Sequence, residues 1–175
     1  MVEEKVEIRR VELSDIHLMV KFANNPLVLV NMRDNFPDPF LVEDAVDFVN
    51  REMEEVIPKY FVILFNGDFA GMIGLLSQSF SYRHSAELGF WIAEPYWNFK
   101  IAERAVKLMV NHTFASNNYE RLFCRVFEYN KPSMRVLEKA GFKLEGIGKM
   151  AIKKNNKIFD EYQYAILKQT NPSEY

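Results

Sequence analysis

The residues with the clearest chemical use in this chain lie in the stretch 86–145. In the run EYNKPSMRVLEKAGF, Asn130 and Ser133 stand at the head of an expected helix and Gly141-Phe142 at its foot. The surrounding pattern is strand, helix, strand, helix, strand, an order that would leave a cleft between two strands. Helix N-termini at the rim of such a cleft attract anionic ligands. The stretch therefore predicts a protein that binds a phosphate-bearing cofactor.

The elements that position these residues follow from apolar periodicity and turn signals. The pair Asn66-Gly67 between two apolar runs predicts a hairpin, and the prolines of residues 31–40 predict a loop held by Phe36 and Phe40. The expected strands are Lys5–Val11, the two runs around Asn66-Gly67, Ala86–Ala93, Leu122–Phe127, and a final hairpin of Phe142–Ile152 and Lys157–Leu167. The expected helices are residues 13–25, Val42–Val56, Ile101–Phe114 and Lys131–Ala140. The pattern indicates an α+β fold with a mixed, mostly antiparallel sheet and helices on both faces.

Length and composition bound the class of protein. The chain has 175 residues, 49% of them hydrophobic, which is enough for a full core. We expect one domain over residues 1–168 and a frayed tail over 169–175. The net charge of −2 predicts no nucleic-acid partner. The single Cys124, the absence of a leader-like apolar run, and the absence of about 18 consecutive apolar residues predict a cytoplasmic protein with no membrane partner.

The order of elements, the strand AELGFWIAEPYW and the helix EYNKPSMRVLEKAGF together resemble the GNAT superfamily of acetyl-CoA-dependent N-acetyltransferases. Within it, the chain is most similar to the branch that contains the ribosomal-protein alanine and serine N-terminal acetyltransferases. The resemblance runs from Val6 to Leu167 and is most specific over Glu87–Gly146. It implies a sheet of about seven strands with one splayed strand pair, and acetyl-CoA as co-substrate. No metal is expected, since the three histidines show no metal-ligand spacing.

The resemblance also implies roles for the cofactor residues. The pantetheine arm of the cofactor would pair with the backbone of Trp91, Ile92 and Ala93, as a ligand added to a strand edge. Asn130 matches a position that bonds the pantetheine region, and Ser133 a position that faces the thioester sulfur, where it would assist the departing thiolate. The alternatives from local structure stay open. Asn130 is also a plain helix N-cap, and a serine in a first helical turn usually bonds nearby backbone.

Glu87 is the candidate general base. An attacking amine must lose a proton, and a positioned carboxylate can accept it directly or through water. The alternative is a solvated or salt-bridged strand glutamate.

The chain departs from the pattern of the family that it resembles in the phosphate loop. The branch commonly has Gly-Lys-Gly-aromatic-Ala after a tryptophan, and the resemblance places this loop at Asn98, Phe99, Lys100, Ile101 and Ala102, where both glycines are missing. Glycine matters where a positive φ is needed, and asparagine tolerates that backbone best among other residues. Lys100 would add a cation near the phosphates.

Two hypotheses of function follow. The first is transfer of acetyl from acetyl-CoA to a primary amine, on a protein N-terminus or a small molecule, by direct attack. The alternative is a catalytically weak or inactive CoA-binding or regulatory module, favoured by the missing glycines. The acceptor would be a peptide or a small-molecule amine. Four acidic residues near the expected acceptor side could attract a cationic amine, or they could simply be solvated loop charges: Asp34, Asp38, Asp160 and Glu161. A homodimer is left open.

Overall fold

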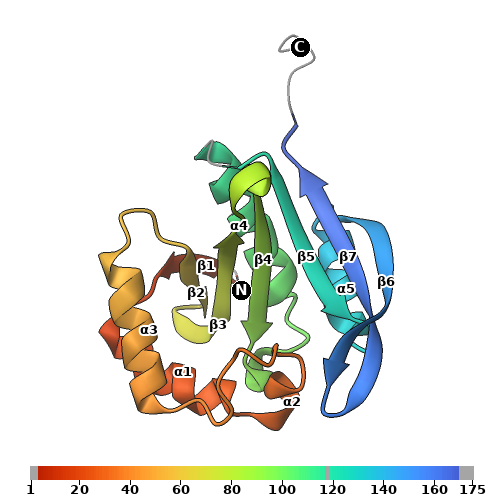
Figure 1. Ribbon diagram of the computed structural model, residues 1–175. Coiled ribbons are helices and arrows are strands. Elements are labelled where there is room, and N and C mark those ends of the chain that lie inside the picture. The colour runs from red at the N-terminus through yellow and green to blue at the C-terminus, as the bar shows by residue number, and fades with distance from the viewer. Residues whose placement is uncertain (1–3, 117–118, 170–175) are drawn as a thin grey trace. The chain divides into compact units, whose positions relative to one another are not determined.

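The computed structural model describes residues 4–116 and 119–169 (Figure 1). The chain forms two compact units. The first comprises residues 1–75 and 89–109, and the second residues 76–88 and 110–175.

Seven strands join in one sheet in the order β1-β2-β3-β4-β5-β7-β6. The strands are β1 (Val6–Arg10), β2 (Tyr60–Phe65), β3 (Asp68–Ser77), β4 (Ser85–Ile92), β5 (Arg121–Phe127), β6 (Lys143–Lys154) and β7 (Lys157–Leu167). The helices are α1 (Ile16–Ala23), α2 (Pro26–Leu29), α3 (Val42–Glu54), α4 (Ile101–Ala115) and α5 (Lys131–Lys139). Strands β4 and β5 are parallel, and the pairs β1–β2, β2–β3, β5–β7 and β6–β7 are antiparallel. The expected mixed, mostly antiparallel α+β fold is confirmed.

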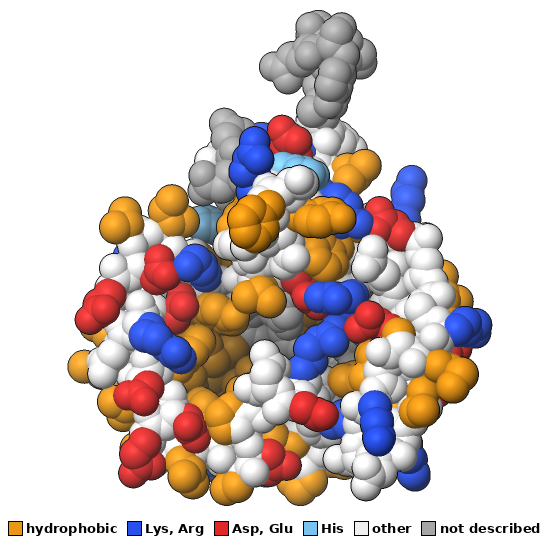
Figure 2. All heavy atoms as spheres, in the orientation of Figure 1, with side chains coloured by type: hydrophobic (Ala, Val, Ile, Leu, Met, Phe, Trp, Pro, Cys, Tyr) orange, Lys and Arg blue, Asp and Glu red, His pale blue; other side chains and the backbone are white. Residues whose placement is uncertain are grey.

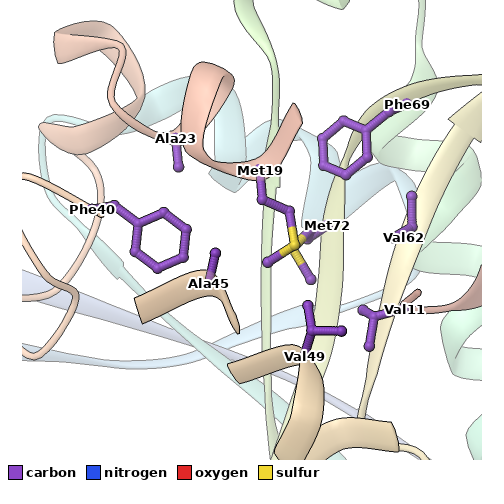
Figure 3. Packing of buried hydrophobic residues seen from close by; sticks show 9 residues of the cluster. All are labelled: Val11, Met19, Ala23, Phe40, Ala45, Val49, Val62, Phe69 and Met72. Atoms are coloured by element: carbon purple, nitrogen blue, oxygen red, sulfur yellow. The ribbon is translucent and has the colours of Figure 1, made fainter. Parts of the chain in front are cut away.

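The core of the first unit is an apolar cluster between α1, α3 and the first strands. Figure 3 shows Met19 of α1, Val49 of α3 and Met72 of β3 pointing toward one another. Phe40 joins the cluster from the loop of residues 31–40, and its ring lies 4.9 Å from that of Phe36. The two phenylalanines therefore hold this loop, as the sequence predicts.

The second unit is built around β5, whose residues alternate in burial. Leu122, Cys124 and Val126 are buried, whereas Arg121, Phe123 and Arg125 are only half-buried. This is the period of two expected for a strand with one face against a core. Strand β7 pairs with β5 on one side and β6 on the other, and Asn155-Asn156 closes the β6–β7 hairpin in the left-handed backbone region, with φ values of 49° and 60°.

Most element boundaries fall within three residues of those expected, and the four-residue helix α2 was not expected. Within the described residues, no helix is long and apolar enough to cross a membrane, and no group of three acidic, histidine or cysteine side chains could hold a metal ion. Of the tail expected over 169–175, residues 170–175 lie outside the described residues. The single domain over 1–168 stays a prediction.

Candidate acetyl-transfer site

The segment that replaces the glycine-rich loop precedes α4 in the first unit. Asn98 has a φ of 69° and Lys100 a φ of 57°, so both take the left-handed backbone conformation. These are the two positions at which the related loop commonly has glycine and this chain does not. The Lys100 carbonyl then accepts the Arg104 backbone N–H at 3.3 Å, in the first turn of α4. The chain thus keeps the backbone that glycine usually allows, at a steric cost to the two side chains.

Two contacts hold this loop in place. The Trp97 indole N–H donates to the Ile92 carbonyl at 2.7 Å, and the Phe99 ring lies 5.6 Å from that of Phe65. The first contact joins the loop to the end of β4. In the first unit, the structure therefore brings together two predicted cofactor segments, Trp91–Ala93 and Asn98–Ala102.

A bulge in β3 shapes the end of β4. The β2–β3 register shifts between Ile63 and Leu64, and near this shift the Ala93 N–H donates to the Ala70 carbonyl at 2.8 Å. The neighbouring Gly71 passes so close to β4 that a Cβ atom there would lie 2.1 Å from the Trp91 carbonyl oxygen. Bulges of this kind bend a strand and re-aim its neighbours. Gly71 therefore allows the Trp91 backbone to approach β3 this closely, a requirement that the sequence did not reveal.

The head of α5 in the second unit has the geometry of a capped helix. The Asn130 side-chain oxygen accepts the Ser133 backbone N–H at 3.2 Å, with Pro132 in the first turn. The cap expected for Asn130 is confirmed, while its cofactor role stays a prediction. Ser133 is half-buried, and among the described residues no hydrogen bond engages its hydroxyl group. Its hydroxyl is therefore available to a ligand.

Glu87 of β4 is held by an arginine that the sequence analysis missed. Arg125 of β5 donates through Nε to Glu87 Oε1 at 3.2 Å and through Nη2 to Oε2 at 2.5 Å. The hydrogen bond to Glu87 raises the pKa of Arg125, against the opposing effect of its burial. The alternation of Arg121, Phe123 and Arg125 along β5 was the signal that could have identified this face of the strand.

The acidic residues expected near an acceptor differ in their surroundings. Asp34 and Asp38 are exposed in the loop of residues 31–40 of the first unit. In the second unit, Asp160 accepts from Lys149 Nζ at 2.7 Å and from the Met150 N–H at 3.0 Å, and these bonds lower the pKa of Asp160. Asp160 is thus a member of a hairpin ion pair.

Comparison with known proteins identifies the class of this enzyme. The chain is 30% identical over 168 residues to the uncharacterized N-acetyltransferase YnaD of Bacillus subtilis, covering 95% of each chain. It is 27% identical over 142 residues to spermidine N(1)-acetyltransferase of Escherichia coli, covering 81% of this chain and 74% of the relative. The chain is an N-acetyltransferase by class. Residues 5–143 match the acetyltransferase (GNAT) domain, and the chain belongs to that family.

Solved structures agree with this assignment. The GNAT acetyltransferase of Bacillus anthracis superposes with a TM-score of 0.81 at 28% identity, covering 94% of this chain and 96% of the other. RimL, a ribosomal L7/L12 alpha-N-protein acetyltransferase solved with coenzyme A, superposes with a TM-score of 0.83 at 19% identity, covering 95% and 96%. The second likeness shows the fold alone. The expected family and fold are confirmed.

Proposed function

We propose that this protein transfers an acetyl group from acetyl-CoA to a primary amine by direct attack. The amine nitrogen bonds to the thioester carbonyl carbon, the carbon–sulfur bond breaks, and the CoA thiolate leaves. The nitrogen gives up one proton, and the product is an amide. No covalent enzyme intermediate is needed.

The observation that carries the proposal is the backbone of the loop before α4. Asn98 and Lys100 hold left-handed φ values without glycine, in the loop that leads into a helix N-terminus. Backbone N–H groups at a helix N-terminus favour negative charge, and here they would bind the pyrophosphate of CoA. Lys100 would add a cation.

The remaining roles belong to side chains in β4 and at the head of α5. Glu87 would accept the amine proton, directly or through water, and the Ser133 hydroxyl would hydrogen-bond the departing thiolate. A thiol has a pKa of about 8.5, so the thiolate needs little help near neutral pH. The Asn130 side-chain amide would bond the pantetheine region while its oxygen caps α5. Backbone groups of Trp91, Ile92 and Ala93 would pair with the pantetheine amides.

The acceptor would be a small-molecule amine or a protein N-terminus, the two kinds named among the similar proteins, spermidine and ribosomal protein. Acidic residues are also present on the surface of α3, where they would attract a cationic acceptor if the helix lies near the acceptor's path. Figure 2 shows Asp and Glu side chains gathered over α3, and Glu43, Asp47 and Glu54 of this helix are exposed. Solvated surface charge is the simpler account of any single one of them.

The alternative is a CoA-binding module with weak or no catalysis. The observation in its favour is the left-handed Lys100, since a lysine is an unusual residue for that backbone.

Two measurements separate these functions. Calorimetric titration with CoA tests the cofactor, and release of free thiol from acetyl-CoA with a panel of amines and N-terminal peptides tests catalysis. Binding with transfer to one amine class supports the enzyme. Binding without transfer to any acceptor supports the module, and no binding would contradict both.

A further inference from the structure

Glu87 and Arg125 form a two-point ion pair between neighbouring strands of the second unit. The last residue pair of the β4–β5 ladder is Glu87 and Phe123. Arg125 lies two residues further along β5, so its guanidinium reaches back past Phe123 to the carboxylate. The Glu87 side chain is 11% exposed and that of Arg125 36% exposed. The pair is therefore partly withdrawn from water, where a fork-shaped guanidinium holds a carboxylate more firmly than a single surface contact would.

The ring of Phe123 lies against the guanidinium group of Arg125. The Arg125 guanidinium lies 5.5 Å from the centre of that ring, and the Arg121 guanidinium lies 5.2 Å from the same ring. Arg121 is itself paired with Glu145 of β6. Figure 2 shows basic and acidic side chains side by side over this part of the sheet. The two arginines therefore share a strand and a contact with the Phe123 ring. They differ in the carboxylate that each one binds.

The fork fixes the plane of the carboxylate. Arg125 donates one hydrogen bond to each Glu87 oxygen, and two parallel bonds of this kind set the orientation of both planar groups. A base is effective only when it is within hydrogen-bond reach of the proton it takes, and small misplacements are costly.

We propose that Arg125 is a positioning residue for acetyl transfer, whose guanidinium fixes the orientation of the Glu87 carboxylate toward the acceptor amine. This rests on the proposed function, in which Glu87 is the base. Within the same unit, Glu161 of β7 also acts electrostatically on Arg125 and raises its pKa, whereas the two-point fork is made to Glu87.

The test compares Arg125→Gln and Arg125→Lys with the matched control Arg121→Gln, each alone and each combined with Glu87→Gln. Steady-state transfer is measured as free-thiol release, with thermal unfolding of every variant. Arg125→Gln should lower kcat by about 10- to 100-fold with the KM for acetyl-CoA nearly unchanged. Arg125→Lys should recover part of the loss, because lysine keeps the charge without the fork. Arg121→Gln should change kcat less than about threefold.

The combined variants give the decisive readout. If Arg125 acts through Glu87, Arg125→Gln should cost less than about twofold once Glu87 is already glutamine, a strong departure from additivity. Equal losses for Arg125→Gln and Arg121→Gln, or additive losses in the double variant, would overturn the proposal while the transferase function stands. If Arg125→Gln does not fold, Arg125→Lys decides the matter, since a rate equal to that of the wild type would overturn it. A wild-type protein that binds CoA but acetylates no amine would instead overturn the proposed function, and the positioning role with it.

Discussion

Replacing Lys100 by glycine should stabilise the protein, whereas replacing it by alanine should leave the stability nearly unchanged. Lys100 has a φ of 57°, where an L-residue loses about 1–2 kcal/mol relative to glycine. Glycine removes this cost but adds roughly 0.5–1 kcal/mol of entropy to the unfolded chain. Taken at the midpoints of the two ranges, the net gain expected from glycine is about 0.75 kcal/mol. Alanine keeps the Cβ atom and the cost.

Thermal unfolding measures this difference directly. In a domain of this size, 1 kcal/mol corresponds to roughly 2–4 °C, so Lys100→Gly should raise Tm by about 1–4 °C. The matched control is Lys107→Gly, an exposed lysine within α4. Glycine there should cost about 1 kcal/mol and lower Tm. A fall in Tm for Lys100→Gly similar to that of the control would refute the argument from backbone strain.

The same two Lys100 variants separate charge from backbone in cofactor binding. Both lose the ammonium group, whose ion pair with an exposed phosphate is worth about 0.5–1 kcal/mol. Calorimetry should therefore show CoA bound roughly 2- to 5-fold more weakly by either variant. Pantetheine, which lacks the nucleotide phosphates, should bind as it does to the wild type. Unchanged CoA affinity in both variants would show that Lys100 does not contact the phosphates.

Other substitutions test the rest of the site. Asn130→Ala removes the cap of α5, and should cost about 1 kcal/mol in thermal unfolding and weaken CoA binding in calorimetry. Ser133→Ala should lower kcat a few-fold with Tm unchanged; wild-type kinetics in both variants would contradict these assignments. Glu87→Gln should slow transfer by roughly 10²-fold near neutral pH, with a smaller deficit in alkali, where more acceptor amine is deprotonated. A near-normal rate at every pH would remove Glu87 from the mechanism. Gly71→Ala should push on the backbone of β4 and lower stability by about 1–3 kcal/mol, with weaker CoA binding; a wild-type Tm would contradict the close approach. Burial and a hydrogen bond raise the pKa of Tyr164 to about 12. Because the folded pKa exceeds the ordinary 10.0, this group stabilises the fold fully below pH 10 and loses its contribution as the pH rises toward 12, which an ultraviolet titration with unfolding curves can follow.

Local signals predicted the elements of the fold well. The pair Asn66-Gly67 and the run around Asn155-Asn156 both close hairpins, and each of the four residues has a positive φ. The sequence marks such turns because only a few residue types tolerate that backbone. Helix α2 was missed because four residues are too short for apolar periodicity to register. Its only signal was local, since Asn25 accepts the Leu27 N–H before a first-position proline.

The side-chain partners of the site were harder to predict. The alternation of β5 shows which of its residues share a face, but not which residue of another strand lies beside them. The partnership of Glu87 and Arg125 depends on the β4–β5 register, and these residues are 38 positions apart. The left-handed Lys100 was missed for a different reason. Its side chain disfavours that backbone, so the conformation is imposed by the surrounding structure against local preference.

The place of β7 in the sheet has a consequence for how the protein is made. Among the described residues this strand comes last in sequence order, yet it lies between β5 and β6 and pairs with both. During synthesis, every residue of the first unit has been added once Met109 is joined to the chain. The sheet of the second unit cannot be completed before Leu167 is added, because β5 and β6 both pair with β7, which ends at that residue. A nascent chain stalled before β7 would therefore expose the unpaired edges of β5 and β6. Exposed strand edges can pair wrongly between chains, and chaperones bind such surfaces.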